Sequence, residues 1–262
     1  MVVIIFLIGI SIGSFLNCFV YRIEIGEKPK GRSYCPKCKH QLSYKDLVPI
    51  FSYLFLRGKC RYCKEKISLE YPLVELLTGA LFSFAFLFLS NNGIFESSLI
   101  LGVVEMFFLS VVLFFLIFIF VYDFKHFIIP DFATFSLVGV SSVFLILQSF
   151  LEKDFNFIFS GVLSAIGAFL FFFALYFFTK GKGMGFGDVK FVVFMGLFLR
   201  FPNIIVALFI SFLFGAIMGL GLIILGKKKM KSQIPFGPFL ITGTLLAYFY
   251  GAKIIEIYLS YL

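Results

Sequence analysis

Two aspartates in this 262-residue sequence stand at the ends of long apolar runs, each next to a short basic connection. Asp188 closes the tetrapeptide Gly185-Phe186-Gly187-Asp188, and Asp123 is followed closely by Lys125 and His126. A carboxylate this close to lipid is energetically costly, so it indicates function. Two carboxylates in a poorly solvated site cannot both ionise easily, and they titrate as a unit that holds one proton. Such a pair can activate water and protonate a leaving group, which is the chemistry of an aspartic peptidase.

The residues around these acids leave alternatives open. Gly185 and Gly187 lack a Cβ, so we expect unusual backbone angles there and close approach of a substrate strand. The plainer alternative for Asp188 is a flexible loop followed by a helix-capping aspartate. As its partner, Asp131 competes with Asp123. Asp131 follows a proline and can be explained as a cap, so the sequence favours Asp123.

Three further polar residues lie near the predicted membrane boundary. Lys125 and His126 could contact substrate or tune the acid pair, but anchoring at the interface explains them equally well. Glu75 begins an apolar run on the same predicted side as the acids, so it is a candidate for shaping the site.

Four of the five cysteines form two Cys-x-x-Cys pairs, with 21 residues between the pairs. They are Cys35, Cys38, Cys60 and Cys63. Four thiolates in this pattern typically close a tetrahedral structural zinc site, so the spacing favours a metal over a redox role. Cys18 lies alone in an apolar run and is expected to be a small buried hydrophobe.

The composition indicates which kind of structural element holds the aspartates and cysteines in place. The chain is 61% hydrophobic and only 14% charged, and its apolar runs are continuous rather than alternating. Runs of about 20 residues predict an all-α polytopic membrane protein and argue against a β-barrel. We expect eight transmembrane helices, at about residues 1–21, 71–90, 98–122, 131–150, 157–178, 189–200, 204–225 and 236–258.

The net charge of +9 is explained by membrane orientation, without nucleic acid. Basic residues concentrate in 22–70, between the first and second spans, and in a cluster at 227–231. These segments are therefore predicted to be cytoplasmic, with the N-terminus outside and both aspartates at the inner face. We divide the chain into a first helix (1–21), a cytoplasmic cysteine-rich segment (22–70) and a membrane-embedded domain (71–262).

With these residues in view, the chain resembles the bacterial type IV prepilin peptidases, a family of GxGD-type aspartic proteases. The resemblance spans nearly the whole sequence. It is carried by Gly13-Ser14-Phe15-Leu16-Asn17, the paired cysteines, Tyr71-Pro72-Leu73-Val74-Glu75, Asp123 with Ile129-Pro130-Asp131, Gly185-Phe186-Gly187-Asp188, and Ile234-Pro235-Phe236-Gly237-Pro238.

The resemblance implies cleavage of prepilins or pseudopilins after a glycine, at the cytoplasmic face of the bacterial inner membrane. Asp123 and Asp188 match the family's two catalytic aspartates. The residues expected to bind substrate or shape the site are Gly185, Gly187, Lys125, Glu75, Pro235 and Gly237. Methylation of the new N-terminus with S-adenosylmethionine rests on the resemblance alone, since the sequence holds no nucleotide-binding fingerprint.

Each alternative function predicts sequence features that can be compared with those of this chain. The cysteine-rich segment argues against another GxGD protease, such as a preflagellin or signal-peptide peptidase. A transporter or a zinc-regulated scaffold would favour acids at mid-span, whereas the key acids here are predicted at the inner edge. A membrane thiol oxidoreductase would need a reactive cysteine pair rather than one closed by metal. The pilin system, the oligomeric state and the methylation activity stay open.

Overall fold

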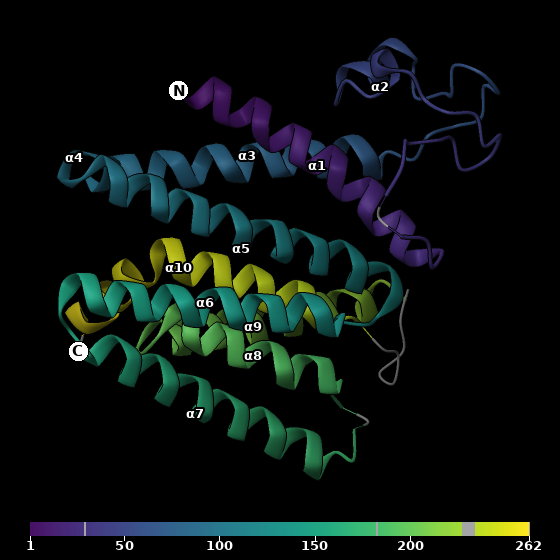
Figure 1. The fold of residues 1–262 in the computed structure, drawn as a ribbon. Coiled ribbons are helices and arrows are strands. Elements are labelled where there is room, and N and C mark those ends of the chain that lie inside the picture. The colour runs from purple at the N-terminus through teal and green to yellow at the C-terminus, as the bar shows by residue number, and fades with distance from the viewer. Residues whose placement is uncertain (29, 182, 227–233, 262) are drawn as a thin grey trace. The chain divides into compact units, whose positions relative to one another are not determined.

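The computed structural model describes residues 1–28, 30–181, 183–226 and 234–261 (Figure 1). The predicted basic cluster at 227–231 lies outside the described residues. The described part of the chain is helical, which confirms the predicted all-α fold. Its elements are α1 (Val2–Glu24), η1 (Tyr44–Asp46), α2 (Phe51–Phe55), α3 (Glu70–Asn91), α4 (Ile94–Ser97), α5 (Leu99–His126), α6 (Asp131–Glu152), α7 (Asn156–Phe178), α8 (Phe186–Leu199), α9 (Asn203–Ile224) and α10 (Gly237–Ser260).

Seven of the described helices are long and apolar enough to cross a membrane, namely α1, α3, α5, α6, α7, α9 and α10. The remaining predicted span, about 189–200, corresponds to α8, which has only 14 residues. A helix of that length does not reach across a hydrocarbon core by itself, since about 20 residues are needed. The eight predicted spans are therefore seven long helices and one short one.

The fold divides into two compact units, Met1–Phe118 and Ile119–Leu262, and the boundary falls within α5. In unit 1, α1 packs against α3. A Cβ at Gly9 would lie 2.7 Å from the Cα of Gly79, and one at Gly13 would lie 2.7 Å from the Cα of Glu75. The two helices approach this closely because these positions carry no side chain.

In unit 2, the short helix α8 packs on four neighbours: α6, α7, α9 and α10. Its large side chains Phe191, Val192, Phe194 and Met195 are fully buried. A helix that is apolar all round is expected in such a central position. Figure 1 shows the α5–α6 turn and the starts of α8 and α10 at one end of this unit.

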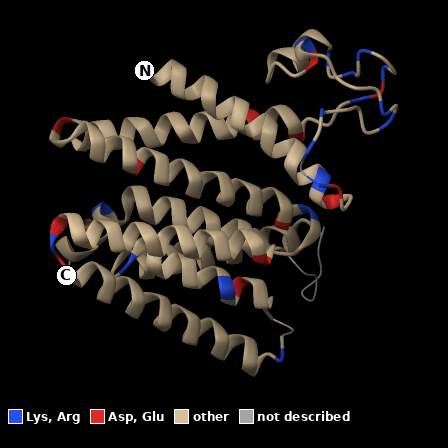
Figure 2. Cartoon of the chain, viewed as in Figure 1, with Lys and Arg blue, Asp and Glu red and all other residues tan. Residues whose placement is uncertain are grey.

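Charged residues lie mainly at helix ends and in the segment between α1 and α3, as Figure 2 shows. The long helices are uncharged over most of their length. Between α1 and α3, the described residues 25–28 and 30–69 have little regular structure: one 3₁₀ turn, one five-residue helix and two isolated β-bridges, Tyr34–Gln41 and Lys59–Lys66. Their folding therefore depends on something other than helix packing.

Candidate active site and metal centre

Asp188 lies in the first turn of α8, where only 7% of the residue is exposed. The helix begins at Phe186, three residues before the predicted start, so Asp188 is its third residue rather than its cap. Oδ2 of Asp188 accepts a hydrogen bond from the backbone N–H of Gly185 at 3.2 Å. An anion is favoured here, because the first turn of a helix presents unpaired N–H groups and the positive end of its dipole.

Asp123 lies in the last turn of α5 and is 4% exposed. Its Oδ2 accepts a hydrogen bond from the backbone N–H of Gly237 at 3.0 Å, across 114 residues of sequence. Gly237 is the first residue of α10. A Cβ at this position would lie 2.5 Å from the same oxygen, so the helix can approach the carboxylate only with glycine.

Ile129 connects the two acidic positions. This buried residue lies in the turn between α5 and α6. A Cβ at Gly187 would lie 3.1 Å from the Cβ of Ile129, and one at Gly237 would lie 3.3 Å from its Cδ1. The starts of α8 and α10, next to which Asp188 and Asp123 lie, therefore converge on one side chain. We call Asp123, Asp188, Ile129 and the backbone of Gly237 the aspartate cluster.

The expected reason for the glycines is wrong in part. Gly185 has a φ of −74°, which any residue adopts, and a Cβ there would meet only ordinary contacts, the nearest at 3.5 Å. Gly187 lies within the helix. The need for glycine at Gly187 and Gly237 comes from close packing against neighbours, not from unusual backbone angles.

Asp131 differs from the two clustered acids in exposure and in partner. It is the first residue of α6, its side chain is 61% exposed, and it forms an ion pair with Lys190 of α8. The sequence offered Asp131 as the alternative partner of Asp188. The ion pair and the helix start account for Asp131 without chemistry.

The other predicted site residues are distributed over the fold. Lys125 is exposed on the last turn of α5, and Pro235 lies two residues before Gly237 in the segment that leads into α10. Glu75 is buried in α3 of unit 1, where its carboxylate accepts a hydrogen bond from the N–H of Ile50 at 2.7 Å. The described partners of Glu75 thus belong to unit 1 and not to the aspartate cluster.

The four paired cysteines converge, since their sulfur atoms all lie within 4.8 Å of one another. Cys35 and Cys60 are buried, while Cys38 and Cys63 are exposed. Burial would raise the pKa of the Cys35 thiol, but hydrogen bonds from the backbone of Cys38 and Lys37 outweigh it and lower the pKa to about 7. Four convergent sulfurs, one of them readily ionised, are a donor set that could hold a metal ion such as zinc.

The two cysteine pairs form matching turns. The N–H of Cys35 donates to the carbonyl of His40, and the N–H of Cys60 donates to that of Glu65. The residue after each pair, Lys39 or Lys64, has a positive φ of 59° or 61°. Each turn therefore presents its two sulfurs on one side, which is the geometry of a zinc knuckle.

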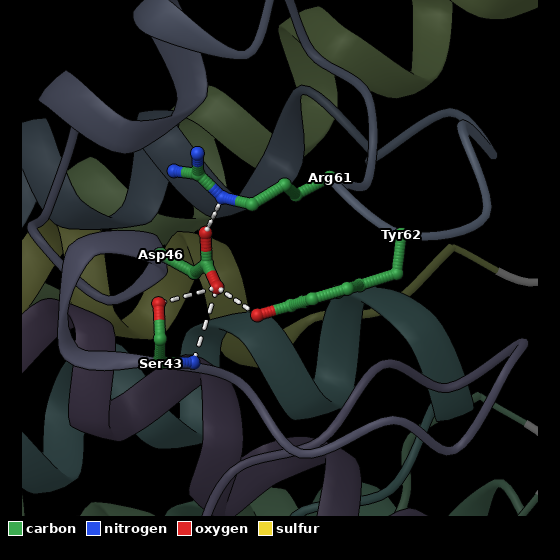
Figure 3. Close-up of polar contacts among 4 residues, drawn as sticks. All are labelled: Ser43, Asp46, Arg61 and Tyr62. Carbon is green, nitrogen blue, oxygen red and sulfur yellow. Dashed lines mark hydrogen bonds and ion pairs between the residues drawn. The ribbon is translucent and has the colours of Figure 1, made fainter.

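Asp46 links the second turn to the rest of the segment (Figure 3). Its carboxylate accepts hydrogen bonds from Arg61 at 2.6 Å, from Tyr62 at 3.1 Å, and from the hydroxyl and N–H of Ser43 at 2.8 and 3.1 Å. Burial would raise the pKa of Asp46, but these hydrogen bonds lower it to about 2. The sequence did not predict a role for Asp46, although Ser43-x-x-Asp46 resembles a capping box.

Both parts of the chain match the models of known protein families. Residues 7–89 match the bacterial peptidase A24 N-terminal domain, and residues 110–220 match the type IV leader peptidase family. The first match covers the cysteine segment, and the second covers both aspartates.

Similar full-length proteins carry a single description. A prepilin leader peptidase/N-methyltransferase of Bacillus subtilis (strain 168) is 34% identical, over 99% of this chain and 98% of the relative. One of Aeromonas hydrophila is 32% identical, over 98% and 93%. One of Legionella pneumophila is 31% identical, over 100% and 95%. No solved structure matches the chain significantly.

Proposed function

Because this chain belongs to the type IV leader peptidase family, we propose that it is a membrane aspartic endopeptidase acting on type IV prepilins or pseudopilins. It removes the short basic leader after a glycine, at the cytoplasmic face of the bacterial inner membrane. The relatives are named for both peptidase and N-methyltransferase activity, so we extend the second activity to this chain as well.

The aspartate cluster is the observation that carries the proposal. Asp123 and Asp188 are both nearly buried, and each receives a backbone N–H from the start of a helix. Two such acids within reach of each other's charge cannot both be ionised easily, so one holds a proton while the other accepts one from water. That division of roles is what hydrolysis of a peptide bond by paired carboxylates requires.

The described hydrogen bonds also suggest how the pair is oriented. In each acid the bond from the backbone engages Oδ2. The remaining oxygens are where we place the shared proton and the attacking water. Gly187 and Gly237 keep the two helix starts close enough for this arrangement. Lys125 and Pro235 lie two residues from Asp123 and Gly237 in the sequence, and we propose that they contact the substrate.

The orientation follows from the basic connections. Positive-inside placement of the segment between α1 and α3 puts the N-terminus outside and the ends of α5 and the starts of α8 and α10 inside. The cysteine cluster is proposed to hold zinc in a structural role, because it offers four sulfur ligands and no open position. Beyond the pilin substrate, the partner we expect is membrane lipid, and no nucleic acid.

Co-expression with a prepilin tests the proposal. We expect Asp123→Ala and Asp188→Ala to abolish removal of the leader, measured by mass spectrometry, whereas Asp131→Ala leaves it intact. Asp123→Asn and Asp188→Asn should abolish it as well, although an amide oxygen can still accept the N–H groups of Gly237 and Gly185 and so preserve the fold. Complete processing by either Asp188 variant would reject the mechanism.

The rival protein classes make different predictions in the same assay. A transporter or scaffold with a structural metal would leave the prepilin uncut in the wild type. A related GxGD protease would cut a signal peptide or preflagellin instead. Membership of the type IV leader peptidase family favours the pilin substrate over both.

A further inference from the structure

The short helix α2 carries its large apolar side chains on the outside of the cysteine-rich segment. Phe51, Leu54 and Phe55 recur at helical spacing on one face, and they are 52%, 63% and 85% exposed. The other face turns inwards, where Tyr53 and Leu56 line a cavity of unit 1. We call the exposed apolar residues of this region the apolar face: Tyr44, Leu47, Val48, Phe51, Leu54 and Phe55. An exposed apolar patch marks contact with a partner or with a membrane.

A hydrogen bond fixes the level of this face along the membrane-spanning helix α3. The N–H of Ile50, directly before α2, donates to the carboxylate of Glu75 at 2.7 Å. Glu75 lies five residues after Glu70, the first residue of α3, which is about 7.5 Å along the helix axis. Leu73 and Leu76, at the same level of α3, expose their apolar side chains. The turn into α2 is therefore held at the depth where α3 begins to meet lipid.

The turn itself is strained. Ile50 has a φ of 62° and a ψ of −53°, and the N–H of Phe51 donates to the carbonyl of Pro49 at 2.6 Å. This is a γ-turn of the rare, strained kind, and a β-branched residue is unusual at positive φ. Such a conformation persists only where its surroundings maintain it, and the hydrogen bond to Glu75 does so here. The turn thereby fixes the direction in which α2 leaves α3.

The exposed charges around the apolar face are all positive. Lys45, Arg57 and Lys59 are exposed, whereas the only acid in residues 44–59 is Asp46, whose side chain is 3% exposed. Apolar side chains bordered by cations match the surface of an anionic membrane, where the side chains enter the acyl region and the cations meet phosphates. A second copy of this face, or the basic leader proposed for the substrate, would be repelled by the same charges.

From these observations, and resting on the proposed cytoplasmic placement of the segment, we infer that the apolar face docks on an anionic phospholipid surface, the inner leaflet of the membrane that the long helices cross. Phe51, Leu54 and Phe55 then lie among the upper acyl chains, and the flanking Lys and Arg side chains extend to the phosphates. Docking holds the cysteine-rich segment against the membrane at α3. It also buries apolar surface that the segment does not bury within itself.

Labelling from the lipid tests this contact in the wild type. The full-length protein is reconstituted in nanodiscs of phosphatidylglycerol, doped with a phosphatidylglycerol that carries a photoactivatable carbene precursor high on one acyl chain. Mass spectrometry of the peptides then maps the label. We expect label on residues 51–55, as on the exposed apolar residues of α3. Label on residues 73–77 of α3 with none on 44–59 would overturn the proposal.

Neutralising the cations tests the preference for an anionic surface. The charge variant is Lys45→Gln/Arg57→Gln/Lys59→Gln. Its matched control, which removes as many charges from the two cysteine turns, is Lys37→Gln/Lys39→Gln/Lys64→Gln. In phosphatidylglycerol the charge variant should lose about fivefold or more of the label on 51–55, and the control should keep it. Equal labelling of the wild type in phosphatidylglycerol and in neutral phosphatidylcholine, or equal loss in both variants, would overturn the role of these charges.

Removing the apolar side chains should abolish the contact in either lipid. Phe51→Ser/Leu54→Ser/Phe55→Ser is expected to lose the label on 44–59 while its metal content stays that of the wild type. Protection of 51–56 from hydrogen exchange that appears only when prepilin is added, without label from lipid, would assign the face to the substrate and overturn the proposal. Prepilin cleavage by the same nanodiscs separates the two proposals: cleavage without label on 44–59 refutes only the docking, whereas label without cleavage refutes only the peptidase.

Discussion

The cysteine cluster and the aspartate cluster hold their functional groups in opposite ways. The cysteines lie within 29 residues of one another, in a segment with little helix, and their turns are closed by local hydrogen bonds. The aspartates come from helices far apart in sequence, and a glycine 114 residues away contacts Asp123. The first site is held together by turns and hydrogen bonds that are local in sequence, and the second by the packing of α8 among its neighbours.

The difference explains why each site needs its particular residues. In the cysteine-rich segment, where few apolar side chains are buried, a metal and the Asp46 network can supply the stability that a small core lacks. In unit 2, apolar packing supplies the stability, so the fold does not depend on the two aspartates of the aspartate cluster. A change at one site should therefore leave the other largely intact, and three experiments examine this.

Loss of the metal should produce the largest effect. A structural four-thiolate zinc site contributes an apparent binding free energy of about 10–16 kcal/mol, and this energy is folding energy for the segment. Cys60→Ser, or treatment with a chelator, is expected to remove about one zinc per chain and to make residues 22–69 sensitive to protease. Limited proteolysis with metal analysis provides the measurement.

The control for this experiment is Cys18→Ser, because Cys18 is not part of the four-sulfur cluster. It should retain the metal and the protease resistance of the wild type. Unit 2 should stay protected in all samples. Stoichiometric disulfides without metal in the wild type would contradict the zinc assignment, and proteolysis spreading into α8 would contradict the separation of the two sites.

Gly237→Ala should produce the next largest effect, and in the other unit. The added Cβ would lie 2.5 Å from Oδ2 of Asp123, so the start of α10 or the carboxylate must shift. Misplacement of a reacting group by about 1 Å can slow a reaction by about 100-fold, and we expect that loss in the initial rate of prepilin cleavage. Metal content should not change.

Gly167→Ala is the matched control, since a Cβ at this position in α7 would meet nothing within 4 Å. Its cleavage rate should stay within about twofold of the wild type. A normal rate for Gly237→Ala would show that the close contact with Asp123 is not needed for activity.

The sequence predicted the fold well, because apolar length and basic connections are local signals. It also predicted the convergence of the four cysteines. It did not predict that α8 begins at Phe186 and is central, since its apolar composition alone cannot distinguish a buried core helix from a span.

The contacts within the two sites were harder to predict from the sequence than the fold was. Ile129 carries no chemical signal in the sequence, and its role appears only when two distant glycines are seen to pack against it. Glu75 was expected to shape the acidic site, yet its described contacts lie with Ile50 and Ser14 in unit 1. Such contacts depend on which helices are neighbours, and single-sequence patterns do not encode that.

Asp46→Asn should produce the smallest effect of the three, confined to the cysteine-rich segment. The folded-state pKa of Asp46, about 2, lies below its ordinary value of 3.8, so the folded segment favours the ionised acid. Its stabilisation is therefore complete above about pH 4 and is lost as the pH falls towards 2. Hydrogen exchange of residues 43–62, corrected for the intrinsic rate, should be about tenfold faster in the variant at pH 7.

The difference in exchange rate between wild type and variant should vanish near pH 2. Acid also releases the metal from both proteins, so the difference at pH 7, where the metal is held, is the one that isolates the carboxylate. A difference that persists at pH 2, or is absent at pH 7, would mean that Arg61 and Tyr62 hold the turn without the charge of Asp46.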